Sequence, residues 1–573
     1  MFEKISIHTT RQFVPTDLNT GDWAGLAPLF EQLEKQLSAA TNAEQLEQVI
    51  LNWEELSAAI AEESSKRYIA MTCQTDDKTA EQDYLDFVEK IEPEEKQCSF
   101  RLAKALSNHP HRDSLPSKRY EVFTRDSALE VELFRPENVE LETETTKLGQ
   151  QYQKLIGGLA VHYDGEERTL VQMGRYLEET NRARRQEAWE LVANRRLEEA
   201  ETIDGQLDSL AKRRNQMSAN AGFPNYRDFA HRRKGRFDYT PDDCLAFHDA
   251  IEQEMVPLLR ELHDERQASL GIESLKPWDT ATDPQGRAPL KPFDEVPQLI
   301  SRTQAIFDQL DDDLAGWFQT MQNLDLLDLA NRKGKAPGGY QDSLAEARLP
   351  FIFMNSVGVQ RDVETLLHEA GHAFHTLACQ DEPLHSYRHA PIEFCEVASM
   401  AMELLGGEYL GEFYNTEEVR RARITHLEGI VFVFSWIATV DAFQHWLYLN
   451  PGHSVPQRDD AWDGLMERFG GGIDWSGHER ARSKYWHKQL HIFLHPFYYV
   501  EYGIAQLGAL QIWANSKQNR ALALADYKAA LALGGSRPLP ELFERCNTRL
   551  DFSRNTVAPM AELLRKELDA LKL

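Results

Sequence analysis

One short segment, residues 362–375 with the sequence DVETLLHEAGHAFH, places the strongest constraint on the fold of this chain. It contains the pattern H-E-x-x-H, in which His368 and His372 are four residues apart. Residues four apart on an α-helix have Cβ atoms about 5–6 Å apart on one face, so both imidazoles can hold one metal ion if the segment is helical. Glu369 lies beside them, where it can act on water. Asp362 is the candidate N-cap of this helix.

A metal site of this kind needs a third protein ligand, and a second segment downstream offers two carboxylates. Residues 391–403, PIEFCEVASMAME, begin with a proline and continue as a helical pattern. Glu393 and Glu396 are three residues apart and share a helix face, so periodicity alone does not separate them. Zinc accepts two histidines and one carboxylate and keeps a fourth position open. The two segments together predict a site for one Zn²⁺ ion.

Other polar residues near these motifs have simpler interpretations. Metal-bound histidines usually donate their second ring N–H to a carboxylate or a carbonyl. Glu364 and Glu403 have suitable spacing for that role, but each is more simply interpreted as a surface charge. His375 follows His372 by one turn, and a packing or solvent role suits it, because a single helix rarely supplies three ligands to one ion.

The remainder of the chain predicts helices and little else. Apolar residues recur at spacings of three and four over residues 26–37 and 46–60, and residues 147–215 are rich in helix formers. Residues 349–355, LPFIFMN, form the best strand candidate. Prolines and glycines gather in loops at residues 271–297, 333–340 and 469–473. We therefore expect a mainly α fold with a small sheet.

Composition excludes several classes of protein. The chain has 63 Lys and Arg against 92 Asp and Glu, a net charge of −29 that disfavours nucleic acid and anionic membrane surfaces as partners. Its six cysteines form no C-x-x-C pair, which indicates reduced thiols and a cytoplasmic location. The longest apolar stretch, residues 429–440, is shorter than the ~20 residues of a membrane span and predicts a buried helix or strand.

The two motifs resemble those of a known family. HEAGHAFH, followed 24 residues after His372 by the glutamate of EFCEVAS, is similar to the thimet oligopeptidase and oligoendopeptidase F family of zinc peptidases. These proteins carry an H-E-x-G-H helix and then a helix with an F-x-E-x-x-S core. The resemblance implies that His368 and His372 are zinc ligands and that Glu369 is the general base. It also selects Glu396 over Glu393 as the third ligand.

The resemblance covers residues 333–513 and also implies a fold. It implies a large helical, zincin-like (neurolysin-like) body with a small β-sheet beside the metal helix, enclosing a deep substrate channel. No linker divides the 573 residues, so we expect one compact structure. Within it we expect an N-terminal helical region at residues 1–145 and a catalytic body at residues 146–573.

A second informative run, residues 491–502 with the sequence HIFLHPFYYVEY, combines histidines with tyrosines. Pro496 suits the first turn of a helix, on which Tyr498 and Tyr502 would share a face. Phenol and imidazole groups can donate hydrogen bonds to the oxyanion that forms when water attacks a peptide carbonyl. Taken alone, the run is more typical of an aromatic core stripe. The resemblance implies instead that a histidine and tyrosines from it lie over the zinc.

The roles within this run are open to more than one assignment. We assign catalytic roles to His491, Tyr498 and Tyr502, and a substrate-binding role to His495. His495 competes with His491 for the position of the family histidine, and Tyr499 competes with the other tyrosines.

Three further residues are expected to contact substrate. His389, seven residues before Glu396, matches a family histidine near the substrate, although it can equally be an ordinary loop residue. Gly338 and Gly339 would let their loop approach or close over a peptide. The strand at residues 350–355 would bind a peptide as an added strand if its edge were free.

The function that follows is zinc-dependent endopeptidase activity on oligopeptides through a metal-activated water, with Glu369 passing the proton of water to the leaving amine. A helical zinc carboxypeptidase is the nearest alternative, and a non-catalytic helical binding protein comes from a different class. A zinc aminopeptidase would be expected to carry G-x-M-E-N, whereas FMN at residues 353–355 lacks the glycine and the glutamate. Oligopeptides are the expected partners, and the sequence does not define an oligomeric state.

Overall fold

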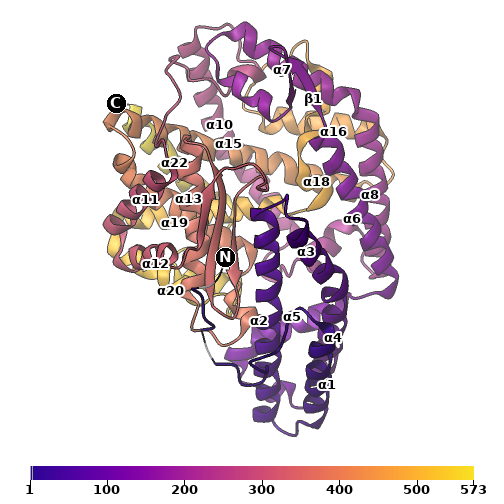
Figure 1. The fold of residues 1–573 in the computed structure, drawn as a ribbon. Coiled ribbons are helices and arrows are strands. Elements are labelled where there is room, and N and C mark those ends of the chain that lie inside the picture. Colours follow the sequence, from indigo (N-terminus) through magenta and orange to yellow (C-terminus); the bar gives the residue numbers. More distant parts are fainter. Residues whose placement is uncertain (1, 3, 9, 573) are drawn as a thin grey trace. The chain divides into compact units, whose positions relative to one another are not determined.

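The computed structural model describes residues 2, 4–8 and 10–572, and it is mainly α-helical, as predicted (Figure 1). Its residues group into two compact units, each of which combines three stretches of the chain. The first unit contains Met1–Glu132, Leu290–Ala422 and Gly508–Leu550, and the second contains Leu133–Pro289, Arg423–Leu507 and Asp551–Leu573.

The first unit carries the predicted metal-binding segments. Its N-terminal helices are α1 (Trp23–Ala39), α2 (Ala43–Cys73), α3 (Lys78–Lys90), α4 (Glu92–Ser107) and α5 (Ser117–Leu133). Its middle stretch contains α11 (Val296–Leu310), α12 (Asp312–Asn323), β3 (Leu327–Ala330), β4 (Tyr340–Leu344), β5 (Leu349–Ser356), α13 (Gln360–Ala378), the short 3₁₀ helix η4 (His385–Arg388) and α14 (Ile392–Gly406). Its last stretch includes α20 (Arg520–Leu531) and α21 (Leu539–Arg545).

The second unit is also helical. It contains α6 (Pro136–Gly157), β1 (Ala160–Tyr163), β2 (Glu166–Thr169), α7 (Arg182–Glu198), α8 (Ala200–Asn220), α9 (Tyr226–Arg233), α10 (Pro241–Leu270), α16 (Val455–Phe469), α17 (Glu479–Ser483), α18 (Leu490–Leu494) and α22 (Arg554–Lys572). Two helices, α15 (Thr416–Leu449) and α19 (Tyr499–Gln518), have residues in both units.

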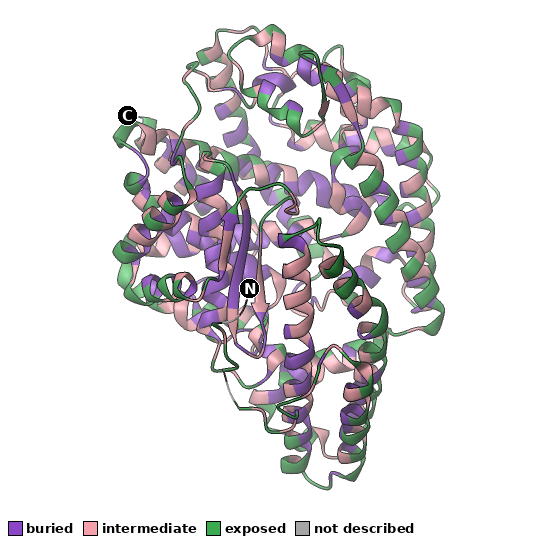
Figure 2. Ribbon diagram, in the orientation of Figure 1, coloured by how far each residue is buried: buried purple, intermediate pink, exposed green. Residues whose placement is uncertain are grey.

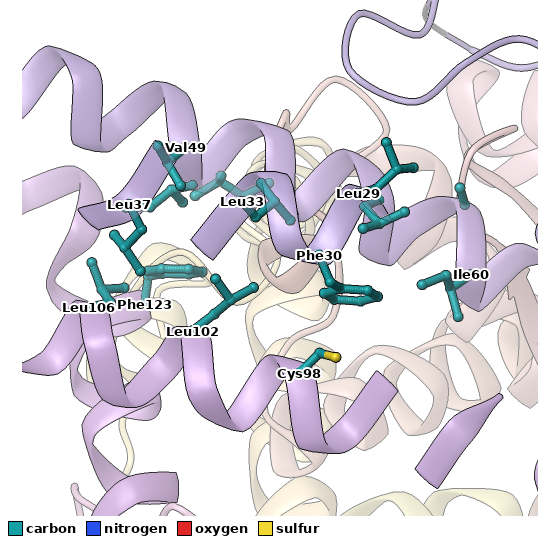
Figure 3. Packing of buried hydrophobic residues seen from close by; sticks show 14 of the residues in the cluster. Leu29, Phe30, Leu33, Leu37, Val49, Ile60, Cys98, Leu102, Leu106 and Phe123 are labelled. Atoms are coloured by element: carbon teal, nitrogen blue, oxygen red, sulfur yellow. The ribbon is translucent and has the colours of Figure 1, made fainter. Parts of the chain in front are cut away.

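The predicted apolar stripes of α1 and α2 form the core of the N-terminal helices. Leucines and aromatic residues of α1, α2, α4 and α5 interdigitate there, and Figure 3 shows Phe30 and Leu33 of α1 among them. The same core includes Leu384 and Tyr387, next to and within η4. The Tyr387 hydroxyl donates a hydrogen bond to the Arg119 carbonyl at 2.7 Å. The N-terminal helices therefore hold in place the segment that leads to His389 and α14.

Residues 147–215 are not continuously helical as expected. The short β1–β2 hairpin interrupts them, with Ala160 paired to Thr169 and Tyr163 paired to Glu166. Asp164 and Gly165 form its turn with φ of 52° and 78°. An Asp-Gly pair is favoured in a two-residue turn because both positions need positive φ.

The strand predicted at residues 349–355 is β5, and it is buried along most of its length (Figure 2). It lies in the middle of a three-stranded sheet of order β3-β5-β4, parallel to β3 and antiparallel to β4. The expectation of a free edge on this strand is wrong, because both edges are paired. Among the described strands of this sheet, β3 and β4 form the edges.

The pairing also shows which way the backbone of β4 points. Ile352 of β5 donates its N–H to the Leu326 carbonyl at 2.9 Å, so its polar backbone groups face the β3 side. Gln341 is the antiparallel partner of Ile352 on β4. Because N–H and C=O of one strand residue point to the same side, those of Gln341 point away from β5.

The apolar segment at residues 429–440 lies within α15 and is a buried helix, as predicted. Among the described residues, α15 is the one helix long and apolar enough to cross a membrane by length and composition, and 72% of its most apolar window is buried inside the structure.

Candidate metal centre

The metal helix, α13, begins two residues before the predicted N-cap. Its first residue is Gln360, so Asp362 occupies the third helical position. From there the Asp362 carboxylate accepts the backbone N–H groups of Val357, Gly358 and Val359 at 2.8, 2.8 and 3.0 Å. Three N–H groups at the helix start are thereby satisfied by one side chain, which fixes the register of the histidines that follow.

The three predicted ligands converge in the first unit. Glu396 Oε2 lies 3.5 Å from His368 Nε2 and 3.9 Å from His372 Nε2, and all three ligand atoms lie within 4.8 Å of one another. Two imidazole nitrogens and one carboxylate oxygen at this spacing fit a single divalent ion with bonds of about 2.0–2.2 Å. Glu393 is not part of this group.

Helices α13 and α14 approach each other at Gly371, which lies between the two histidine turns. A Cβ atom on Gly371 would lie 2.5 Å from Ser399 Cα and 2.7 Å from the Ala398 carbonyl oxygen. Both neighbours are backbone atoms of α14, so they cannot rotate away as a side chain could. The glycine thus sets the helix separation that brings Glu396 to the histidines.

Gly371→Ala is therefore expected to destabilise the protein by about 2–3 kcal/mol, because α14 must shift to admit the methyl group. Thermal unfolding followed by circular dichroism measures this, and zinc content should fall with it. Gly316→Ala in α12 is the control, since open space surrounds a Cβ there and a small stabilisation is expected. Equal melting temperatures for Gly371→Ala and the unmodified protein would contradict the packing argument.

Glu403 is not the surface charge that the sequence favoured. Its Oε1 lies 2.6 Å from His368 Nδ1, so the histidine donates this N–H and presents Nε2 to the ligand group. Burial lowers the pKa of His368, but the hydrogen bond and the charge of Glu403 outweigh burial and raise the pKa to about 9. The surroundings of this ring thus favour positive charge, which a bound cation supplies.

Glu403→Gln is expected to weaken metal binding by about 10–100-fold while the three ligands remain, because the carboxylate that orients His368 and increases its basicity is lost. Competition with a metal-chelating dye measures the affinity. Glu364→Gln on α13, where the side chain bonds Gln360 rather than a ligand histidine, should leave the affinity unchanged. The same affinity in both variants would show that Glu403 has no role at the centre.

Glu369 is buried beside the ligands, with 8% of its surface exposed. Burial raises its pKa to about 7, although the nearby charge of His368 opposes the shift. The backbone N–H of Gln341 faces this carboxylate and also opposes the rise in its pKa. Glu369 therefore lies next to the edge of β4 that is not paired with β5. A carboxylate with a pKa near neutrality can both accept and return a proton.

His375 is buried and packs edge-on against Phe394 with ring centroids 5.9 Å apart. Its expected packing role is therefore confirmed.

Gly338 has a φ of +99°, a conformation that favours glycine. The Asn355 side-chain amide donates to the carbonyls of Ala336 and Gly338 at 2.7 and 2.9 Å. This bond ties the glycine-rich loop to β5, and a Cβ on Gly339 would lie 3.4 Å from Thr365 of the metal helix.

His389 follows η4 as an exposed residue, and its charge contributes to lowering the pKa of His372, for which burial is the main cause. Gly534 and Gly535, which the sequence reasoning missed, pack closely against the backbone of residues 387–389. Gly535 donates its N–H to the Tyr387 carbonyl at 2.7 Å, and a Cβ on Gly535 would lie 2.4 Å from the His389 carbonyl oxygen. The Gly-Gly dipeptide in the sequence LALGGSR could have indicated a close approach of two backbone segments here.

The histidine and tyrosine residues of the second run come together in the second unit. The ring of His491 lies 5.8 Å from Tyr498, 6.0 Å from Tyr502 and 6.2 Å from His495. Tyr499 is also in contact, with its ring centroid 4.8 Å from that of His491. Burial lowers the pKa of His491 to about 4, so this ring is neutral near pH 7.

The local structure of this run differs from the prediction. A helix beginning at Pro496 was expected, whereas α18 ends at Leu494 and α19 begins at Tyr499. Phe497 has a φ of +62°, which breaks the helical path between them. Tyr498 therefore precedes α19, yet its ring centroid still lies 5.1 Å from that of Tyr502.

Comparison with known proteins identifies the family to which this chain belongs. The profile of peptidase family M3 matches residues 175–562, and that of the peptidase M3 N-terminal domain matches residues 13–134. The chain belongs to peptidase family M3. The resemblance to oligoendopeptidase F is thereby confirmed, and membership of this metallopeptidase family implies a metal at the centre.

Curated relatives in family M3 align with only part of the chain. Oligoendopeptidase F homolog of Borreliella burgdorferi is 25% identical over 228 residues, 38% of this chain and 37% of the relative. Oligopeptidase PepF of Bacillus subtilis is 30% identical over 134 residues, 23% of this chain and 19% of the relative. The matched regions thus span 37% and 19% of the length of these relatives.

Solved structures match over nearly the whole chain. PZ peptidase A with inhibitor 2 has a TM-score of 0.88 at 28% identity, covering 98% of this chain and 99% of that chain. A Bacillus anthracis protein designated oligoendopeptidase F has a TM-score of 0.84 at 26% identity, covering 98% of this chain and 100% of that chain. The helical, zincin-like fold expected from the sequence is confirmed.

Proposed function

We propose that this member of family M3 is a zinc-dependent endopeptidase that hydrolyses peptide bonds in oligopeptides. The convergence of His368, His372 and Glu396 within 4.8 Å of one another, beside the buried Glu369, carries the proposal. These three residues would hold one zinc ion through two imidazole nitrogens and a carboxylate oxygen. Bound zinc would supply a positive charge that polarises the scissile carbonyl and makes water more acidic.

The residues of the chain perform the proton transfers in this proposal. Glu369, with a pKa near 7, accepts a proton from the attacking water and returns it to the leaving amine. The Gln341 N–H faces this carboxylate and favours its charged form, and Glu403 holds His368 in the tautomer that leaves Nε2 available to the metal. Both supports act before substrate arrives, so little reorganisation is needed during the reaction.

The edge of β4 is the surface that we assign to the substrate backbone. At Gln341 its backbone groups point away from β5, and they lie next to Glu369. A peptide added to this edge would gain main-chain hydrogen bonds with little demand on its sequence. In this arrangement Gly338 and Gly339 keep side chains out of the neighbouring loop, and His389 contributes a substrate contact.

The other assignments rest on the family resemblance and stay predictions. His491, Tyr498 and Tyr502 would stabilise the oxyanion and His495 would bind substrate, with Tyr499 as the alternative tyrosine. The substrate channel, the division into residues 1–145 and 146–573, and a cytoplasmic location are likewise predictions.

Mass spectrometry of products from a peptide library of mixed lengths tests this function. Internal cleavage of short peptides that stops on chelation and returns with zinc is the expected result. Stepwise loss of single C-terminal residues would instead show a carboxypeptidase. Absence of products from a zinc-loaded protein would identify a non-catalytic binding protein.

A further inference from the structure

A second group of metal-binding side chains lies in the interior of the second unit. His231 of α9, Cys244 of α10 and His445 of α15 each place one ligand atom within 4.8 Å of the others. All three residues are buried, with 4%, 0% and 3% of their surfaces exposed. Asp441, one turn before His445 on α15 and fully buried, adjoins them with its Oδ2 3.3 Å from His445 Nε2.

This cluster also concentrates polar atoms that lack hydrogen bonds. Among the described residues, His231 Nδ1, His445 Nδ1 and Asp441 Oδ1 are buried with no hydrogen-bond partner, whereas His445 Nε2 faces Asp441 Oδ2. Buried polar atoms are nearly always paired, because leaving them unpaired costs the free energy of their desolvation. Three such atoms beside a buried thiol point to a ligand that satisfies them together.

We propose that His231, Cys244, His445 and Asp441 bind a second zinc ion in a closed, structural site. Zinc matches a set of nitrogen, sulfur and oxygen donors, and four protein ligands leave no position for substrate or water. On binding, the Cys244 thiol loses its proton to solvent and becomes the thiolate ligand. One thiolate, one carboxylate and one Zn²⁺ ion then sum to zero charge, which a buried site tolerates.

The residues around the cluster orient Asp441 for the metal and constrain His231. His248 Nε2 lies 2.9 Å from Asp441 Oδ2, and donation of this N–H leaves Oδ1 for the metal. Arg236 Nη1 donates to His231 Nε2 at 3.1 Å, so the ring proton of His231 is on Nδ1, the nitrogen that has no partner. With zinc at Nδ1 the ring proton moves to Nε2, and Arg236 Nη1 must turn aside while its Nη2 keeps the 2.7 Å bond to Glu501.

That adjustment makes His231 the weakest of the four ligands. Loss of His231 should therefore reduce zinc affinity less than loss of Cys244. The site joins two consecutive helices, α9 and α10, to α15, which is distant from them in sequence. Its expected contribution is to the stability of the second unit, independent of the peptidase function proposed above.

Metal analysis of the full-length protein tests the proposal. Protein purified in the presence of zinc should contain two zinc ions per chain by mass spectrometry of the metal. Replacement of zinc by cobalt(II) should give a thiolate-to-metal charge-transfer band in the near ultraviolet. The first centre holds no sulfur ligand, so this band reports the second site alone.

Variants separate the two sites. Cys244→Ser should lose the band and one metal equivalent, whereas Glu396→Gln should keep the band. Cys546→Ser, which alters another buried cysteine, is the matched control and should keep both metals. Should Cys244→Ser fail to fold, His445→Gln and the cobalt titration of the unmodified protein provide the same readout. One zinc ion per chain, or a cobalt protein without the charge-transfer band, would overturn the proposal.

Discussion

Glu369→Gln is expected to lower kcat/KM for a fluorogenic oligopeptide by about 10²–10⁴-fold. Glutamine has nearly the same shape as glutamate and can occupy the same position, but it cannot take a proton from water. The zinc content and the circular dichroism spectrum should be unchanged. The loss is therefore expected in kcat rather than in folding or metal binding.

The matched control for this variant is Glu364→Gln, which alters a carboxylate on the same helix that bonds Gln360. Its kcat/KM should stay within the error of the unmodified enzyme. Near-normal activity of zinc-loaded Glu369→Gln would mean that another group is the base, and the proposed chemistry would then be wrong.

Glu396→Ala is expected to abolish activity by a different route, through loss of the metal. Removing the carboxylate leaves two imidazoles, and the zinc affinity should fall by orders of magnitude because a three-ligand site becomes a two-ligand site. Metal analysis after dialysis against a weak chelator measures the loss. Activity of the unmodified protein should return on zinc addition, whereas the variant should not recover at the same zinc concentration.

Glu393→Ala is the control, one turn earlier on α14 and outside the ligand group. Because Glu393 is itself buried, its variant must first be shown to fold by thermal unfolding. It should then retain zinc. Retention of zinc by Glu396→Ala and its loss from Glu393→Ala would reverse the assignment of the third ligand.

Local patterns predicted the elements that carry the metal ligands. The four-residue spacing of His368 and His372 needs only a helix, and β5 is an apolar run bounded by turns. What local periodicity could not supply was the choice between Glu393 and Glu396, which share a helix face. That choice depends on how α14 crosses α13, and the crossing is determined at Gly371 by contacts between residues about 30 positions apart.

Other differences between the predicted and the observed elements arise from tertiary structure or from turn signals that were overlooked. Pairing of β5 on both edges involves β3, which precedes it by some twenty residues, so the free edge could not be judged from its own sequence. The start of α19 is displaced by the positive φ of Phe497. A positive φ is unusual for phenylalanine, so the residue type gave no reason to predict it. The β1–β2 hairpin, in contrast, carried a readable Asp-Gly signal that the helix-rich composition around it obscured.

The close approach at Gly371 has a consequence for protein design. Transplanting the two histidines and the glutamate onto another pair of crossing helices would reproduce the ligands without reproducing the distance between them. A scaffold with alanine or a larger residue at that point would hold its helices too far apart for one ion to reach both. In the sequence HEAGH, the glycine therefore specifies a separation between helices, and a successful graft has to include it along with the ligands.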